Sequence, residues 1–385
     1  MKRVLLLLCI VQIFNKQEQF KNKKVVAMEQ FIKNVIICVS CILLFSCNKK
    51  ENPVFFSISV NTNENSSLPL SEITEKIEVI ELEVTDESLI SRVLDVLDTD
   101  DYYIIRETTS VMLFDKKGKF FRKIGSIGQG PGEYVNIIDI AVDNKKEKIF
   151  ICTNTSKIIC YDINGKFLKE TPNGYYKSLK NITFINGRLL AFSDQMDSNE
   201  KDLHNIILYS IEGENLSITD TLMLTQFRSV YSAATMSNDF ILNDGSNICL
   251  FYTDFASRTI VFDTMYCINK HFHVTPYLKL NLTNEGYSIT GDKDIYMFNI
   301  YKSSRFVFAH YRNKNIYSYF CYDTKTEKGY NMENGYIDDI HTMRKNVRIR
   351  PFDSDANKFY YSFTNINESD NDEPNPTLYV GTLKK

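Results

Sequence analysis

The stretch from Phe114 to Lys169 contains one structural unit followed at once by a second version of itself. The segment 114–119 reads FDKKGK and returns 47 residues later as YDINGK at 161–166. Short apolar runs separated by polar turns fill the interval between them. A repeat of about 40 to 50 residues made of short strands is typical of a β-propeller blade.

The aromatic residue that marks this repeat can be followed through the rest of the chain. Its occurrences are Phe114, Tyr161, Tyr209, Tyr266, Tyr322 and Tyr379, at successive intervals of 47, 48, 57, 56 and 57 residues. Around the first two marks we expect four strands each, at 92–97, 102–106, 111–115 and 119–124, and at 137–142, 148–153, 157–162 and 166–170. Six marks therefore predict an all-β, six-bladed β-propeller of four-stranded antiparallel blades.

The two ends of the repeat array predict how the ring closes. Only six residues follow Tyr379, which is too few for the outermost strand of the last blade. The segment Ile77 to Val84 alternates apolar and acidic residues, as a half-buried strand does, and it belongs to no blade of its own. We expect it to pair with the segment Leu378 to Leu383 and to supply the missing strand. Such closure removes two exposed sheet edges.

The N-terminal region reads as an export signal. An apolar run from Val35 to Phe45, in which Ser40 is the one polar residue, follows Lys33. Its eleven residues are too few to cross a bilayer as a helix but fit a signal-peptide core. The run ends Leu44-Phe45-Ser46-Cys47, which resembles the lipobox of bacterial lipoproteins, although Phe45 departs from its usual small residue. Cys47 is the predicted lipidation site, and several acyl chains would hold the protein stably on a membrane. The alternative is a cleaved or buried segment with an incidental cysteine.

Residues 1–27 hold a second apolar run, Val4 to Phe14, and two export signals in tandem make little physical sense. Translation from Met28 would explain this, and an anchor of two short hairpin helices is the alternative. We therefore divide the chain into a signal region at 1–46, a lipid-anchored tether at 47–76 and the propeller at 77–385. The tether contains one strand-like run at Phe55 to Val60.

The charge distribution argues against one class of partner. The net charge of −3 hides a basic N-terminus, since residues 47–385 carry 38 basic and 46 acidic residues. A mildly acidic body without a basic stripe is not expected to bind nucleic acid.

Several segments resemble a known family. The segment 120–134, FFRKIGSIGQGPGEY, the blade after it, 262–266 and the ending 372–384 are similar to the six-bladed β-propeller lipoproteins common in Bacteroidota. The second blade is also similar to an NHL repeat. The resemblance covers most of 47–385 and implies the fold and an envelope location, with the outer membrane as the place of anchoring. It implies no agreed activity.

Two groups of residues invite a chemical interpretation, each with a simpler one beside it. The glycines at 125, 128, 130 and 132 could cradle a phosphate, but a strand follows them where such a loop needs a helix, so we expect an inter-blade crossover with positive φ. His271 and His273 would share one face of a strand and could bind a metal, but no third ligand is recognisable, which favours a solvated face.

The cysteines of the exported body are odd in number, namely Cys152, Cys160, Cys249, Cys267 and Cys321, so at least one has no partner within the chain. We expect Cys152 and Cys160 to point to opposite faces of their sheet, which argues against a disulfide between them. Buried small apolar residues are the simplest interpretation.

Acidic residues cluster at 95, 98, 100 and 101, at 139 and 143, and at 370, 372 and 373, and carboxylates are the ligands that calcium takes. Several of them, such as Asp100 and Asp101, also read as ordinary turn residues. No nucleophile motif is present.

The sequence thus favours a non-catalytic binding or scaffold protein that presents propeller loops to a protein or glycan, with no assigned catalytic, metal or cofactor residue. The alternative is a calcium-assisted lactonase or esterase, or a glycan-cleaving propeller.

Overall fold

The computed structural model describes residues 55–172, 174–200, 202–228, 241–243, 247–253, 261–269, 271–283, 293–341, 346–364 and 374–385. Nearly all regular structure in these ranges is strand, and α2 (Leu70–Ile73) is a single helical turn. The folded unit comprises Val54–Lys385, so it begins before the predicted boundary at residue 77.

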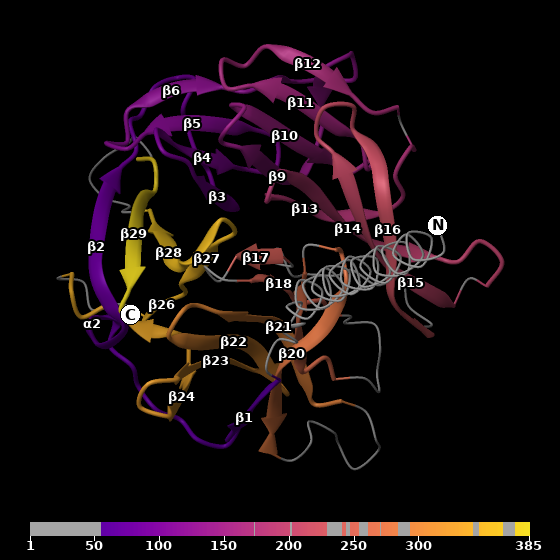
Figure 1. Ribbon diagram of the computed structural model, residues 1–385. Helices are drawn as coiled ribbons and strands as arrows, with labels where there is room; N and C mark the ends of the chain where they lie inside the picture. The colour runs from indigo at the N-terminus through magenta and orange to yellow at the C-terminus, as the bar shows by residue number, and fades with distance from the viewer. Residues whose placement is uncertain are drawn as a thin grey trace, which may run out of the picture. The chain divides into compact units, whose positions relative to one another are not determined.

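Six antiparallel sheets form the six blades of a β-propeller, as the sequence predicts, and Figure 1 shows them around a common centre with the first strand of each blade innermost. Blade 1 is β3 (Asp95–Asp98), β4 (Tyr102–Arg106), β5 (Val111–Asp115) and β6 (Phe120–Lys123), and blade 2 is β9 (Ile137–Asp143), β10 (Lys148–Thr153), β11 (Ile158–Asp162) and β12 (Phe167–Glu170). Blade 3 is β13 (Leu179–Ile185), β14 (Arg188–Met196), β15 (Leu203–Glu212) and β16 (Ser217–Arg228), and blade 4 is β17 (Ile241–Asn243), β18 (Ile248–Leu250), β19 (Thr264–Ile268) and β20 (Val274–Leu282). Blade 5 is β21 (Ile295–Lys302), β22 (Phe306–Asn313), β23 (Ile316–Asp323) and β24 (Lys328–Glu333), and blade 6 is β27 (Arg350–Phe352), β28 (Asp355–Phe363), β29 (Thr377–Leu383) and β2 (Thr74–Glu81).

In blades 1 and 2 the repeated mark has a local physical cause, because it leads into the hairpin between the third and fourth strands. In blade 6 the mark lies within β29, and no hairpin follows it because β2 comes from the other end of the folded unit. In blade 1 the Asp115 carboxylate accepts hydrogen bonds from the backbone N–H groups of Lys117 and Lys119 at 2.8 and 2.9 Å. In blade 2 Asp162 accepts one from Lys166 at 2.8 Å. Gly118, at φ +86°, lies so close to the Glu81 carbonyl that a Cβ atom would clash with it. The mark therefore encodes a tight turn rather than a site.

The ring closes as predicted, through pairing of its two ends. Strand β2 is antiparallel to β29, with Ile77 opposite Gly381 and Ile80 opposite Leu378. Strand β2 is thus the outermost strand of blade 6, and each of the six described blades has its four strands.

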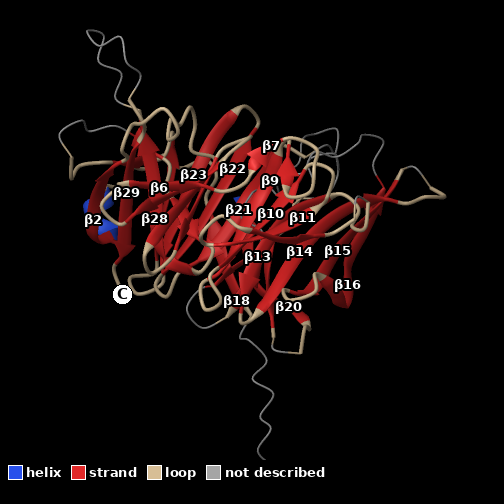
Figure 2. Ribbon diagram, turned by 90° about the horizontal axis from the view of Figure 1, so that it is seen from above, coloured by secondary structure: helices blue, strands red, loops and turns tan. Residues whose placement is uncertain are grey.

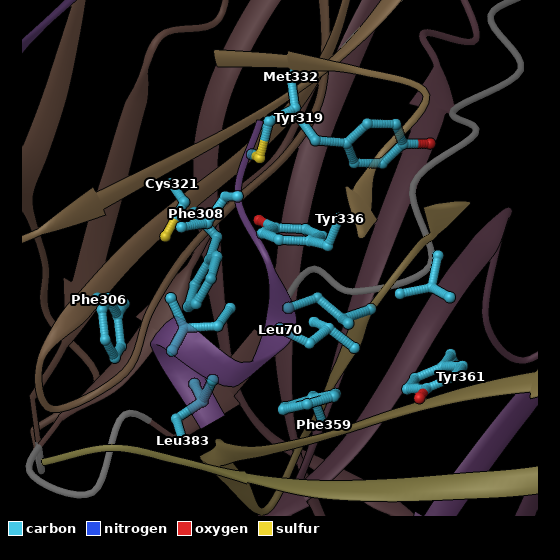
Figure 3. Packing of buried hydrophobic residues seen from close by; sticks show 14 of the residues in the cluster. Leu70, Phe306, Phe308, Tyr319, Cys321, Met332, Tyr336, Phe359, Tyr361 and Leu383 are labelled. Atoms are coloured by element: carbon cyan, nitrogen blue, oxygen red, sulfur yellow. The ribbon is translucent and has the colours of Figure 1, made fainter. Parts of the chain in front are cut away.

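The segment before β2 is bound to the propeller rather than being a loose tether, which the sequence did not predict. Strand β1 (Phe56–Val60) adds to blade 4 as a fifth strand, parallel to β20. Ser66 then exchanges hydrogen bonds with Asn331 of blade 5. Leu70 of α2 is fully buried among Phe308, Tyr336 and other aromatic side chains between blades 5 and 6 (Figure 3). Residues 56–81 therefore bind three successive blades together.

The cores lie between neighbouring blades. Those on both sides of blade 5 and the one between blades 3 and 4 are rich in Phe and Tyr, which fill the space between twisted sheets, whereas the core between blades 1 and 2 is mostly isoleucine. One prediction fails in the core between blades 2 and 3. Cys152 lies opposite Ile158, and Cys160 lies opposite Phe150, so the two cysteines point to the same face. The predicted register assumes a four-residue turn, but Thr153 pairs with Lys157, so the turn has one residue fewer and consists of residues 154–156. Both thiols are nonetheless free and buried.

All innermost strands run in the same direction along the ring axis, because every blade has the same strand order. We call the side on which they begin the entry face and the side on which they end the exit face. Figure 2 shows strands of several blades running side by side between these two loop-covered faces.

Candidate functional site

A cavity of about 380 Å³ opens on the exit face and is built by four blades. Blade 1 contributes Asp98, blade 2 the turn 143–146, and blade 3 the segment 183–187. Asp353 and Ser354 of the β27–β28 hairpin complete the wall. Carboxylate, amide, hydroxyl and ammonium groups therefore surround a space large enough for a small polar ligand or the tip of a larger one.

The β27–β28 hairpin reaches across the end of the tunnel to the opposite blades. The Thr183 hydroxyl of blade 3 donates a hydrogen bond to Asp353 Oδ2 at 3.2 Å, and the backbone N–H of Asn243 in blade 4 donates one to the Asp353 carbonyl at 2.9 Å. Asp353 thereby joins blades 3, 4 and 6. It forms the inner wall of the cavity.

Two carboxylates in the cavity wall are already engaged by the protein. Asp98 forms ion pairs with Lys116 of its own blade and with Lys358 of blade 6, the latter at 2.8 Å. Asp143 caps the β9–β10 turn by accepting hydrogen bonds from the N–H groups of Lys145 and Lys146 at 3.2 and 3.3 Å. Both side chains shape the cavity, and neither is held as a free general acid or base.

The remaining predicted acids of the tunnel form a buried belt. Asp139 of blade 2 accepts hydrogen bonds from the Asn181 side chain and the Ile182 N–H, both at 2.7 Å. Asp95 of blade 1 accepts one from the Tyr360 hydroxyl at 3.0 Å and lies 3.9 Å from Arg106 Nε. Burial raises the pKa of the Asp139 carboxyl well above its usual range, the charge of Asp95 raises it further, and Arg106 opposes the shift.

This belt connects four consecutive blades, from blade 6 through 1 and 2 to 3. In the described ranges no three His, Cys, Asp or Glu residues are placed to hold a metal ion. The acidic cluster at 370–373 lies outside these ranges, as does Cys47 with the whole of 1–54.

The histidine pair is not on a strand, contrary to the prediction. His271 and His273 lie in the β19–β20 turn with ring centroids 6.5 Å apart, and both backbone N–H groups donate to the Asn269 side chain. Phe272 between them adopts φ +62°, which breaks the strand geometry that would align the two rings. Both side chains are exposed, as expected for a solvated segment.

The glycine loop does form the crossover from blade 1 to blade 2, as predicted. Gly125 and Gly132 have φ of +68° and +72°. A Cβ atom at Gly132 would lie 2.7 Å from the Phe167 ring. The loop contains the short parallel pair β7 (Ser126–Ile127) and β8 (Glu133–Tyr134), and Glu133 accepts a hydrogen bond from the Gly130 N–H at 2.8 Å. Its own carboxylate thus occupies the place that an anion would need.

A histidine–aspartate pair on the entry face was not predicted from sequence. His204 Nδ1 lies 3.1 Å from Asp194 Oδ1, both side chains are buried, and the imidazole stacks on Phe227. Both residues line a second cavity of about 320 Å³ together with Ser178, Lys177 and Lys180. In the described part of the chain no hydrogen bond joins the Ser178 hydroxyl to His204, so the three residues do not form a nucleophilic triad. Only the β14–β15 register, with Met196 opposite His204, brings the pair together.

Comparison with known proteins identifies the family. The model of the family described as "Domain of unknown function (DUF4934)" matches residues 54–379. The chain belongs to this DUF4934 family. No match is found among curated proteins.

One solved structure supports the fold of this DUF4934 member. A Bacteroides fragilis protein described as exported aligns with a TM-score of 0.63 and 19% identity, covering 86% of this chain and 100% of that one. The β-propeller domain of Cps50 (Swd1) from Myceliophteria thermophila gives a TM-score of 0.41 at 8% identity, over 80% of this chain and 100% of that one. In the described residues no helix is long and apolar enough to cross a membrane.

Proposed function

We propose that this DUF4934 member is a lipoprotein of the outer membrane, anchored through Cys47, whose propeller binds a protein or glycan partner without catalysing a reaction. The similarity in fold to a Bacteroides protein described as exported supports an envelope location. The lipobox-like segment 44–47 supports the anchor. The family model adds no activity.

The exit-face cavity is the observation on which the binding role rests. Four blades supply its wall, and polar side chains of different kinds converge on it. The carboxylates of the cavity wall are instead held by lysines, by a turn or by the Thr183 hydroxyl. A preformed polar cavity with its charged groups fixed in place favours recognition of a ligand over chemistry on it.

The anchor is tested by expression of the full chain and its Cys47→Ser variant in a Bacteroides host. The parent protein should incorporate radiolabelled palmitate and sediment with outer-membrane vesicles on a density gradient. The variant should lose both the label and the membrane association. Palmitate incorporation that persists in the variant, or a parent protein found in the soluble fraction, would refute the anchor.

The binding site is tested by screening the detergent-purified full chain against glycan arrays and envelope proteins of the same organism. Lys145 is exposed at the cavity rim, so Lys145→Glu should abolish the strongest interaction by reversing a charge in the wall. Lys117→Glu makes the same charge change on an exposed hairpin away from the cavity and should leave the interaction unchanged. Equal loss in both variants, or in neither, would remove the cavity from the proposal.

A further inference from the structure

One face of blade 5 carries aromatic and cationic side chains close to the entry face, opposite the exit-face cavity. We call it the aromatic–arginine patch, and it consists of Tyr296 and Phe298 on β21, His310 and Arg312 on β22, Tyr317 and Tyr319 on β23, and Arg348 just before β27. The sheet register assembles it, because His310 lies opposite Tyr319, and Arg312 lies opposite both Tyr296 and Tyr317.

The rings of the patch are stacked on one another. The His310 ring lies 4.3 Å from the Tyr319 ring at an angle of 9°, and 4.7 Å from the Phe298 ring at 26°. The Arg312 guanidinium lies 4.6 Å from the Tyr296 centroid, and that of Arg348 lies 5.7 Å from the Tyr319 centroid. Tyr317 is 43% exposed, so the stack is open to solvent at one edge.

Within the part of the chain that the structure describes, three polar atoms of this patch are buried and have no hydrogen-bond partner, namely His310 Nε2, Arg312 Nε and the Tyr319 hydroxyl. Tyr319 is only 5% exposed, and Figure 3 shows its hydroxyl directed away from Phe308 and Tyr336. Buried polar groups in native proteins almost always have a partner, so three exceptions on neighbouring strands indicate that a partner is missing.

The missing partner must include a hydrogen-bond acceptor, because Arg312 Nε can only donate. The Tyr319 hydroxyl can donate to the same acceptor, and a neutral His310 ring can donate or accept at Nε2 according to its tautomer. Burial, together with the smaller effect of the charges of Arg348 and Arg350, lowers the pKa of His310 to about 3, so the ring is neutral at physiological pH. The arginines make the surroundings positive, which favours an anionic acceptor such as a carboxylate or sulfate.

We propose that the aromatic–arginine patch binds an anionic sugar, whose acidic group accepts hydrogen bonds from Tyr319 and Arg312 and whose ring rests against Tyr317. A sugar fits better than an acidic peptide, because the stacked aromatic rings provide a flat apolar surface for the C–H face of a pyranose. This site lies on the opposite face from the cavity and stands whether or not the cavity binds a partner.

The test is titration calorimetry of the full chain in detergent with three trisaccharides, namely trigalacturonate, its methyl ester and neutral trigalactose. Trigalacturonate should bind, and the ester and the neutral sugar should bind at least about tenfold more weakly because they lack the charge. A sulfated disaccharide tests whether sulfate or carboxylate is the better acceptor. Tighter binding of either anion over the neutral sugars supports the proposal.

Two tyrosine variants separate binding from stability. Tyr319→Phe removes only an unpartnered hydroxyl, so it should lower the affinity for trigalacturonate about tenfold and leave the melting temperature unchanged or higher. Tyr311 lies on β22 next to His310 but faces blade 4, and its hydroxyl donates to Asn331 Oδ1 at 2.7 Å. Tyr311→Phe should therefore lower the melting temperature and leave the affinity unchanged.

Three results would overturn the proposal. The first is that neither trigalacturonate nor the sulfated disaccharide binds at millimolar concentration, or that neither binds better than the uncharged sugars. The second is an unchanged affinity in Tyr319→Phe. The third is tighter binding of a hexaglutamate peptide than of any anionic sugar, which would assign the patch to a protein partner.

Discussion

Ile80 lies directly opposite Leu378 in the sheet of blade 6, although the two residues come from opposite ends of the folded unit. Both side chains are buried in the core between blades 6 and 1, whereas Val79 on the same strand is 48% exposed. The closure of the ring therefore depends on one face of a single N-terminal strand.

Ile80→Ala should destabilise the whole propeller, since it leaves a cavity at the point where the ring closes. We expect a loss of about 2 to 5 kcal/mol in the free energy of unfolding. Val79→Ala removes a similar apolar side chain that is largely exposed to solvent on the same strand, and it should lower the free energy of unfolding by less than about 0.5 kcal/mol. Urea unfolding followed by circular dichroism measures both. Equal losses in the two variants would mean that β2 is not held through its buried face.

Much of this architecture was predictable because residues that form hairpin turns recur at regular intervals along the sequence. Asp115 and Asp162 cap equivalent hairpins, so their spacing counts blades without any knowledge of long-range contacts. The alternation of apolar and acidic residues in 77–84, and the lack of a fourth strand after Tyr379, then predicted how the ring closes. The attachment of β1 to blade 4 was not predictable, because a parallel pairing with β20 leaves no turn signal in the sequence.

The candidate sites were less predictable for a different reason. The conspicuous groups, such as the glycine loop and the His271–His273 pair, are turn residues whose polar atoms are used locally. The Asp194–His204 pair and the aromatic–arginine patch depend instead on cross-strand register. A shift of one residue in β22 would separate His310 from Tyr319, and nothing in the sequence fixes that register to the residue.

Asp139→Asn should change the pH dependence of stability. An aspartate in an unfolded chain has a pKa of about 3.9, and the folded pKa of Asp139 is raised well above its usual range, mainly by burial. The folded state therefore binds the proton more tightly, and the associated stability is lost as pH rises from about 4 through the folded pKa. Asparagine can still accept the hydrogen bonds from Asn181 and Ile182, and it does not titrate.

We thus expect Asp139→Asn to gain stability relative to the parent protein as pH rises from 4 to 8. Urea unfolding at several pH values measures the difference. Asp100→Asn, in an exposed turn, controls for the loss of one negative charge. A difference that is constant over this range, or that decreases with pH, would contradict the raised pKa.

Calcium should not stabilise the propeller through the tunnel acids. Asp98 is paired with two lysines, and Asp95 and Asp139 are hydrogen-bonded within the belt, so a cation would have to break these contacts to bind. We expect the same melting temperature in millimolar calcium and in chelator. A calcium-dependent increase that is abolished by Asp98→Asn or Asp139→Asn would instead favour the calcium-assisted hydrolase considered from the sequence.

The Arg305–Asp323 pair in blade 5 should stabilise the fold with the opposite pH dependence. Arg305 donates to both oxygens of the Asp323 carboxylate, at 2.8 and 2.6 Å, and these hydrogen bonds hold the pKa of Asp323 well below its usual range. Because the folded pKa is depressed, the stability from this pair is fully present above the unfolded pKa of about 3.9 and is lost as pH falls through the folded pKa.

Arg305→Gln should therefore cost about 1.5 to 3 kcal/mol at pH 7, the range for hydrogen bonds to charged groups, and progressively less below pH 4. Arg305→Lys keeps the positive charge but not the two parallel hydrogen bonds, so its loss should be intermediate. Urea unfolding of both variants and the parent protein at pH 7, 5 and 3 gives the comparison. If the cost of Arg305→Gln were the same at pH 3 as at pH 7, the pair would act through packing of the arginine side chain on Phe306, whose ring centroid lies 4.9 Å from the guanidinium, and not through the charge of Asp323.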